Sequence, residues 1–146
     1  MKEYFDKNPQ SLPYLERLEE EWNQHGKIII AVDYDDTISP WKLRGFDPKR
    51  TIEVLKVAQQ TGAWIVIFTA CKPDRHPEIL KYCEEQGLTV DAINKTPIDL
   101  PYGNDSKIYA NIFIDDRAGL NEALNILEFA TYRIRGSRHH SDFFEF

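Results

Sequence analysis

The chain has 146 residues, of which 42% are hydrophobic and 12% aromatic, which is enough to bury the core of one compact domain. Its net charge of −6 disfavours broad binding to a nucleic-acid backbone, although a local basic rim can still bind an anion. The longest apolar runs are too short to cross a membrane, and the first residues lack the apolar core of a signal peptide. The two cysteines have no Cys-x-x-Cys spacing. We therefore expect them to stay reduced, in a cytoplasmic protein without a structural zinc site.

The N-terminal part of the chain predicts an amphipathic helix and then a buried strand. Leucines and a tryptophan recur at helical spacing over about residues 11–25, with Ser11 as the expected N-cap and Gly26 as the stop. Five apolar residues follow at 28–32, mostly β-branched, and they end at Asp33. Such a run is typical of a parallel strand that is covered on both faces.

Strands and helices alternate through the rest of the chain. In the helix expected from Pro77 to Gly87, we expect Ile79, Leu80 and Cys83 to face the core. The tail beyond residue 130 shows no clear periodicity, and the sequence leaves open whether it docks on the domain or is disordered. The expected elements are a helix from Asp47–Pro48 to Gly62, a strand at 63–68 that stops at Thr69, a helix from Pro77 to Gly87, a short strand at 88–93, a loop at 94–106, a strand at 111–116 and a helix at 120–129.

This alternation predicts a single α/β domain over residues 1–146, with a Rossmann-like parallel sheet flanked by helices and joined by right-handed crossovers. Its expected parts are the N-terminal helix at about 11–25, the core at about 27–130 and the tail at 131–146.

Carboxylates gather where two of the predicted strands stop. Asp33 and Asp35 follow the first strand, and alternate residues of an extended backbone share a face. Asp115 and Asp116 end the last strand. Because ligands bind beyond the carboxyl ends of parallel strands, we expect the four acids to form one site. Their mutual repulsion favours a hard cation such as Mg²⁺, which prefers oxygen ligands.

Two carboxylates at one site can divide the chemistry of phosphate transfer. An ionised one can attack phosphorus, while a protonated neighbour donates a proton to the leaving oxygen. A lysine should help to hold the phosphate, and the sequence offers Lys107 before the last strand and Lys95 after the weak one.

These residues occur in an order that resembles the four motifs of the haloacid dehalogenase (HAD) superfamily of phosphohydrolases, over roughly residues 27–130. Any one motif is common, whereas the four in this order are specific. The matches are Asp33-Tyr34-Asp35-Asp36-Thr37 for motif I, Thr69 after Trp64-Ile65-Val66-Ile67-Phe68 for motif II, Lys107 for motif III and Asp115-Asp116 for motif IV.

The resemblance implies a Mg²⁺-dependent phosphatase that works through an aspartyl-phosphate on Asp33. Asp35 would act as general acid and then as general base, and an acid at this position distinguishes the phosphate-transferring members from the dehalogenases. The short connections between the motifs resemble members without a cap domain. The other implied roles are phosphate binding by Thr69, Ala70 and Lys107, and metal binding by Asp33, by the backbone carbonyl of Asp35 and by Asp115, Asp116 or both.

The natural substrate is left open between a phosphorylated small molecule, a nucleotide and a phosphorylated nucleic-acid end. The stretch at 113–117 is similar to that of small deoxyribonucleotidases, which favours a nucleotide. A homo-oligomer is also left open, and no membrane partner is expected. The alternative function is a non-catalytic scaffold that binds phosphate or metal on the same fold. A receiver domain is disfavoured because its acids and lysine occur in a different order.

Overall fold

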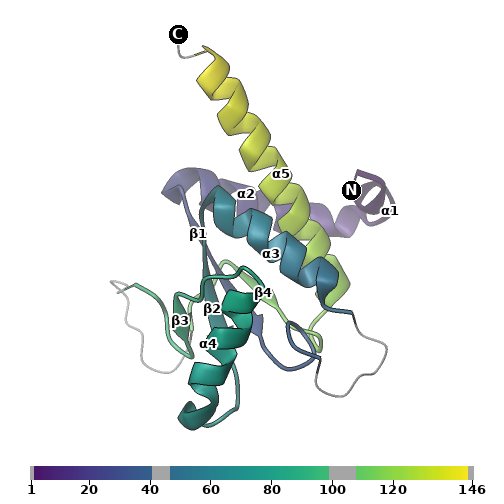
Figure 1. Ribbon diagram of the computed structural model, residues 1–146. Coiled ribbons are helices and arrows are strands. Elements are labelled where there is room, and N and C mark those ends of the chain that lie inside the picture. Colours follow the sequence, from purple (N-terminus) through teal and green to yellow (C-terminus); the bar gives the residue numbers. More distant parts are fainter. Residues whose placement is uncertain (1, 41–46, 99–107, 145–146) are drawn as a thin grey trace.

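The computed structural model describes residues 2–40, 47–98 and 108–144, with side chains described through residue 138 (Figure 1). The helices are α1 (Lys2–Lys7), α2 (Leu12–His25), α3 (Lys49–Gly62), α4 (His76–Glu85) and α5 (Leu120–Phe144), with 3-10 turns η1 (Pro9–Ser11) and η2 (Pro73–Arg75). The strands are β1 (Ile28–Asp33), β2 (Ala63–Phe68), β3 (Ala92–Ile93) and β4 (Ile112–Ile114).

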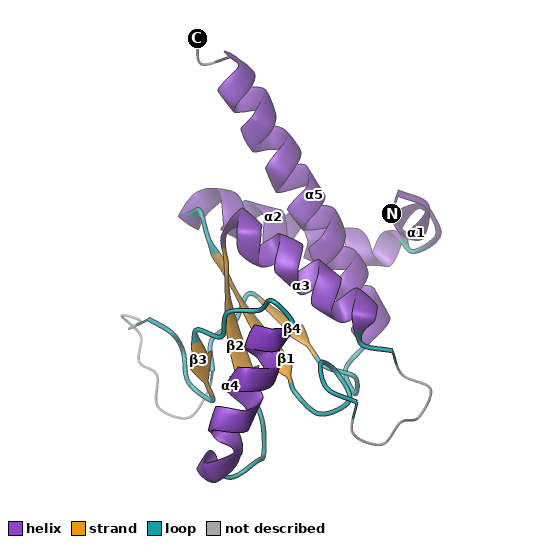
Figure 2. Cartoon of the chain, in the orientation of Figure 1, coloured by secondary structure: helices purple, strands orange, loops and turns teal. Residues whose placement is uncertain are grey.

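The four strands form one parallel sheet in the order β3-β2-β1-β4 (Figure 2). The predicted Rossmann-like α/β fold is thus confirmed. Strand β1 lies between β2 and β4, and its register pairs Asp33 with Phe68 and Val32 with Ile114. Since Asp115 follows Ile114, this register brings the ends of β1 and β4 together at the carboxyl edge of the sheet.

Strand β1 is buried on both faces, as its apolar sequence predicts. Ile28 and Ile30 face the large core, to which α2, α3, α4 and α5 all contribute side chains. Ile29 faces a smaller core with Val66 and Ala92, against which the segment 108–110 packs. Full burial of one such aliphatic side chain contributes roughly 2 kcal/mol, so the strand that carries Asp33 is firmly held.

Two side chains fix the register of the outer strands. The Asp91 carboxylate accepts the Ile65 N–H at 2.8 Å, while the Asp91 N–H donates to the Ile65 carbonyl at 2.8 Å. Asn111 makes the equivalent pair with Ile29, at 2.7 and 2.8 Å. Both residues lie just before an outer strand, so regular pairing starts later than the sequence predicted. Strand β3 has two residues instead of the expected six, and β4 has three.

The helix ends agree with the sequence in part. Gly26 closes α2 in the left-handed conformation with φ of 74°, as expected. Ser11 occupies the N-cap position, but its hydroxyl is buried without a hydrogen-bond partner and does not cap the helix. Pro48, expected in the first turn of α3, occupies its N-cap position, while the Asp47 carboxylate accepts the Lys49 N–H at 3.0 Å.

Helix α4 begins at His76, directly after the unpredicted turn η2. Ile79 and Cys83 are buried as expected, whereas the expected burial of Leu80 is wrong, because this side chain is 42% exposed. Helical geometry explains the difference. Positions three and four apart share one face, and Leu80, next to Ile79, points away from it.

The expected end of the last helix at Phe129 is wrong, because α5 continues to Phe144 and projects beyond the other elements (Figure 1). Ile134 is buried, and Arg138 donates to the carbonyl of Thr61 and, at 3.0 Å, to that of Gly26. These carbonyls lie at the C-terminal ends of α3 and α2, where unpaired acceptors need donors. The long-range contacts therefore hold the first part of the tail.

Helix α1 was also not predicted. Phe5 supplies its buried side chain and stacks on Phe129 of α5, with ring centroids 5.0 Å apart. Among the helices of the described residues, none combines the length and the apolar character that crossing a bilayer requires.

Candidate functional site

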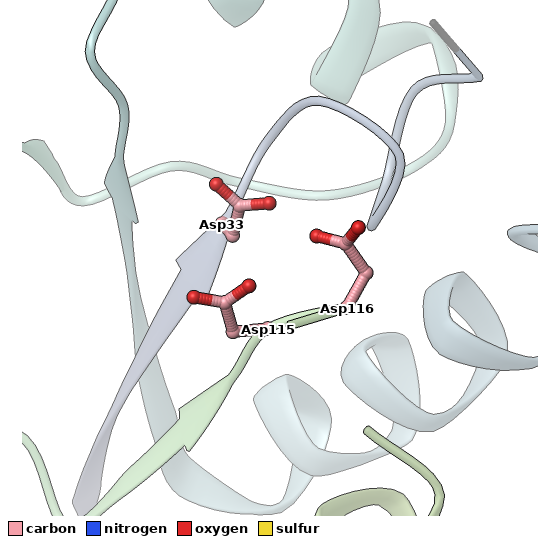
Figure 3. Close-up of side chains that lie close together, drawn as sticks. All are labelled: Asp33, Asp115 and Asp116. Carbon is pink, nitrogen blue, oxygen red and sulfur yellow. The ribbon is translucent and has the colours of Figure 1, made fainter. Parts of the chain in front are cut away.

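Three carboxylates meet at the carboxyl edge of the sheet (Figure 3). Asp33 is the last residue of β1, and Asp115 and Asp116 directly follow β4. One carboxylate oxygen from each lies within 4.8 Å of the others. Asp33 and Asp115 are partly buried and Asp116 is exposed, so the cluster opens to solvent on the side of Asp116. The structure thus brings together three of the four predicted acids.

Thr37 joins two of these acids from the loop after β1. Its side chain is fully buried, with Oγ1 at 3.0 Å from Asp33 Oδ2 and 3.1 Å from Asp116 Oδ1. Its single proton donates to one carboxylate at a time, and its oxygen accepts the Asp116 N–H at 3.0 Å. Thr37 therefore fixes the end of β1 relative to the chain after β4. The sequence placed Thr37 in motif I without giving it this role.

A tight loop returns Thr37 to the sheet. The carbonyl of Tyr34 accepts the N–H groups of Thr37, Ile38 and Ser39 at 3.0 to 3.3 Å. Asp36 has a positive φ of 61°, and its N–H donates to Ser39 at 2.7 Å. The Tyr34 side chain is buried away from the acids and packs edge-on against Tyr82. The buried ring anchors the loop, and its backbone orients the site.

The Asp33 carboxyl is strongly perturbed. Burial, a hydrogen bond with the Asp116 carboxyl and the negative charges of Asp115 and Asp116 raise its pKa to about 7, although the Thr37 hydroxyl partly opposes the rise. Without a cation, the burial of Asp33 and the negative charges beside it therefore oppose ionisation of all three carboxyls at neutral pH. A cation between the acids would reverse this effect and ionise Asp33.

Asp35 does not belong to the cluster. Its carboxylate oxygen Oδ2 lies 3.9 Å from the Cys71 thiol, in the loop that follows β2. Asp35 is not among the acids whose oxygens lie within 4.8 Å of one another, because β1 ends at Asp33 and the chain turns after Tyr34. That Asp33 and Asp35 face one site stays a prediction. The two motif I acids therefore serve different parts of the site.

Thr69 directly follows Phe68, the register partner of Asp33, so it lies at the same edge of the sheet. Asn94 holds its backbone on both sides: the amide oxygen accepts the Thr69 N–H at 2.8 Å and the amide nitrogen donates to the Thr69 carbonyl at 2.9 Å. Asn94 adopts a positive φ of 56°, which asparagine tolerates better than most residues. Sequence reasoning missed it, and its signal is an asparagine at the end of a short strand.

The loop after Thr69 is also ordered by hydrogen bonds. The Cys71 N–H donates to the Thr69 hydroxyl at 3.1 Å, and Arg75 Nη1 donates to Cys71 Sγ at 3.1 Å. Ala70, between Thr69 and Cys71 in the sequence, is exposed. Arg75, Cys71 and Asp35 thus form a row of contacts from η2 to the site.

The predicted phosphate-binding lysines differ in what the structure describes. Lys95 is exposed and follows Asn94 directly, which places it near Thr69. Lys107, the motif III candidate, lies outside the described residues. The same holds for Trp41, Lys42 and Arg44, which the sequence places in the loop after motif I, where they could meet a leaving group.

The donor set of the cluster fits a hard divalent cation. It offers oxygen atoms alone, and no histidine or cysteine of the described ranges belongs to it. Asp115 is already oriented, because its Oδ1 accepts the Arg117 N–H at 3.0 Å. Mg²⁺ prefers such oxygen ligands and keeps several waters, so it does not need a fully enclosed cage of protein groups.

Comparison with known proteins adds support for the fold. The chain is similar to the solved structure of a conserved protein from Bacteroides thetaiotaomicron, with 26% identity and a TM-score of 0.58 over 82% of this chain and 99% of that one. No protein-family model matches the sequence, and no curated protein matches it either.

Proposed function

We propose that the protein is a Mg²⁺-dependent phosphomonoester hydrolase that works through an aspartyl-phosphate on Asp33. The observation that carries the proposal is the separation of its acids. Asp33, Asp115 and Asp116 gather at one point, while Asp35 turns toward the loop after β2. This arrangement supports a division of roles, in which one acid would share a cation with its neighbours and the other would donate a proton.

In the first step an Asp33 oxygen attacks the phosphorus, and the bond between phosphorus and the ester oxygen breaks. Asp35 gives its proton to the departing oxygen, so the leaving group departs as a neutral alcohol. The Thr37 hydroxyl, 3.0 Å from Asp33 Oδ2, holds the nucleophile in place. Its bond to Asp33 limits rotation of the carboxylate, which lowers the entropic barrier to attack.

In the second step Asp35, now ionised, takes a proton from water as the water oxygen attacks phosphorus. The bond between phosphorus and the Asp33 oxygen breaks, and inorganic phosphate leaves with Asp33 restored as a carboxylate. Asn94 holds the backbone of Thr69, so the Thr69 side chain can meet a phosphoryl oxygen from a fixed position. A lysine, Lys107 or Lys95, would add positive charge on this side.

Asp33, Asp115 and Asp116 would hold Mg²⁺ through their side chains, with the backbone carbonyl of Asp35 as a further ligand by resemblance to HAD phosphatases. When bound, Mg²⁺ supplies charge neutralisation for the acids and for a phosphate oxygen. Thr37 keeps Asp116 near Asp33, at 3.1 Å from the same hydroxyl, so that both side chains are available together.

The substrate class proposed from the resemblance is a nucleotide or another phosphorylated small molecule, with a phosphorylated nucleic-acid end as a second source of the same chemistry. The site opens to solvent at Asp116, which suits a range of leaving groups. Cys71 and Cys83 are free thiols, which suits a reducing compartment such as the cytoplasm.

Hydrolysis of a generic aryl phosphate tests the proposal. We expect turnover with Mg²⁺, none with EDTA, and recovery when Mg²⁺ is added back. Asp33→Asn should abolish turnover, since the amide is nearly isosteric but a poor nucleophile. Asp35→Asn should lower kcat at least 100-fold while Mg²⁺ binding, measured by calorimetry, stays within about threefold. Absence of turnover over a broad panel of phosphomonoesters, with Mg²⁺ still bound, would favour the scaffold.

A further inference from the structure

Strand β4 is an edge strand, and no strand of the described residues pairs with its outer side. In the sheet order β3-β2-β1-β4, its neighbour is β1. The Asn111 N–H donates to the Ile29 carbonyl of β1 at 2.8 Å. Because backbone groups alternate in direction along a strand, those of Phe113 also face β1, while those of Ile112 and Ile114 point outward. The N–H and carbonyl groups of these two isoleucines therefore form an open edge.

The side chains along this edge favour pairing with another strand. The sequence of β4 is Ile-Phe-Ile, without the charges or the proline that commonly protect an edge. Phe113 is 45% exposed, which is unusual for a large apolar side chain in a sheet. A groove of about 760 Å³ is lined by residues 108–113, by α2 and by the first turns of α5. Tyr14, on the α2 side of this groove, is 61% exposed.

The two ends of the edge carry opposite charges. At the start of β4, Asn111 Nδ2 donates to Glu21 Oε1 at 3.1 Å, and Glu21 pairs with Arg17 at 3.6 Å. The Arg17 side chain is 77% exposed and that of Glu21 only 23%, so the cation is the outer charge and its ion pair is weak. Beyond the end of β4, Glu122 lies exposed in the first turn of α5. Arg17 and Glu122 both line the groove.

We propose that β4 pairs with β4 of a second copy of this chain, antiparallel and about a two-fold axis at Phe113, to form a homodimer. Ile112 of each copy then lies opposite Ile114 of the partner subunit, and their outward backbone groups bond to each other. Phe113 lies opposite its own symmetry mate, which covers the exposed ring.

Charge complementarity is the reason to choose a second copy as the occupant of this edge. Antiparallel pairing places the start of one strand opposite the end of the other, so Arg17 of each copy faces Glu122 of the partner subunit. A two-fold axis forms this contact twice from a single surface. The inference is independent of the proposed catalysis, because it uses no residue of the acidic cluster.

Sedimentation of the full chain over a range of protein concentrations tests the dimer. Wild type should shift from a monomer of 17.1 kDa to twice this mass. Arg17→Glu should weaken the dimer about 10-fold or more, because two pairs of like charges then face each other, and Glu122→Arg should do the same. The double variant, which exchanges the two charges, should return the dissociation constant to within about threefold of wild type. The control Lys81→Glu, which reverses an exposed charge on α4, should leave it unchanged.

A cysteine at the proposed axis tests the geometry of the interface. Opposed residues of a non-hydrogen-bonded antiparallel pair have Cα atoms about 4.5 Å apart, a distance that a disulfide can span. Oxidised Phe113→Cys should therefore form a covalent dimer joined through residue 113, as identified by mass spectrometry. Leu80→Cys, at another exposed apolar position, should not.

A wild type that stays monomeric up to about 200 µM would overturn the inference and indicate that any strand bound at this edge comes from another protein. A dimer that responds to neither charge reversal, or that forms no disulfide at position 113, would also overturn it, since its interface would lie elsewhere. Circular dichroism checks that each variant is folded. Recovery of the dimer in the double variant would show that the single reversals act at the interface.

Discussion

The raised pKa of Asp33 makes a quantitative prediction about the stability of the metal-free protein. Folding raises this pKa from 3.8 to about 7, so the folded state binds the Asp33 proton more tightly than the unfolded state does. Its contribution to stability is therefore fully present below pH 4, and it is lost as the pH rises through about 7. Asp33→Asn removes this titration, since the amide carries no charge at any of these pH values.

The magnitude follows from the size of the shift. One pKa unit corresponds to about 1.4 kcal/mol, so a shift of about three units sets an upper limit of about 4 kcal/mol. Asp33 is only partly buried and solvent screens its charge, which reduces the expected effect to about 2 kcal/mol. In EDTA, Asp33→Asn should thus gain about 2 kcal/mol of unfolding free energy relative to wild type between pH 4 and pH 8.

The assay is urea unfolding at pH 4, 6 and 8 in EDTA, followed by tryptophan fluorescence, to which the buried Trp22 contributes. Asp6→Asn, which removes an exposed carboxylate from α1, is the control and should follow wild type across this range. Adding Mg²⁺ at 100 times its Kd should stabilise wild type at pH 8 by about 2.7 kcal/mol. If the curves for wild type and Asp33→Asn ran parallel from pH 4 to pH 8, the proposed electrostatic strain in the cluster would be refuted.

Three further predictions concern the residues that support the site and the fold. Thr37→Val should lower kcat about tenfold and weaken Mg²⁺ binding, because the hydroxyl that joins Asp33 and Asp116 is lost; unchanged kinetics and calorimetry would remove Thr37 from the mechanism. Asn94→Gly, which keeps the positive φ but loses both bonds to Thr69, should cost about 1 to 2 kcal/mol in urea unfolding and raise KM severalfold. A variant with the stability and KM of wild type would show that Thr69 is held by other groups. Phe5→Ala should destabilise the protein by about 3 kcal/mol through lost packing on Phe129, and a change below 1 kcal/mol would mean that α1 is not docked in solution.

Much of the framework of the site could be predicted from the sequence. The runs at 28–33 and 63–68 are continuous, β-branched and bounded by polar residues, so their strand character is local information. Their alternation with helices implies a parallel sheet, and parallel strands end at one edge. These two facts place Asp33 and Asp115 at the same edge of the sheet, and the pairing of β1 with β4 then makes them neighbours.

The parts that could not be predicted depend on contacts between distant segments. Phe5 has only Tyr4 as an aromatic neighbour in a short, otherwise charged helix, and it stacks on Phe129, far along the chain. The part of α5 beyond Phe129 has little apolar periodicity, and Arg138 binds carbonyls of two other helices. No local pattern encodes such contacts, because tertiary packing decides them.

The directions of the side chains at the site could not be predicted from the sequence either. The alternation rule holds only while the backbone stays extended, and the turn after Tyr34 sends Asp35 toward Cys71. No sequence motif predicts the hydrogen bonds between Asn94 and Thr69, because they join two loops that the sheet brings together. The contact between Arg75 and Cys71 has no sequence motif either.

The most direct test of the central claim is to trap the covalent intermediate. Wild type and Asp33→Asn are mixed with Mg²⁺ and an aryl phosphate, quenched in acid within milliseconds, digested and analysed by mass spectrometry. The proposed mechanism predicts one phosphoryl group on Asp33 in wild type and none in the variant. A turning-over enzyme with no phosphoryl group on Asp33, or with one on a different residue, would contradict it.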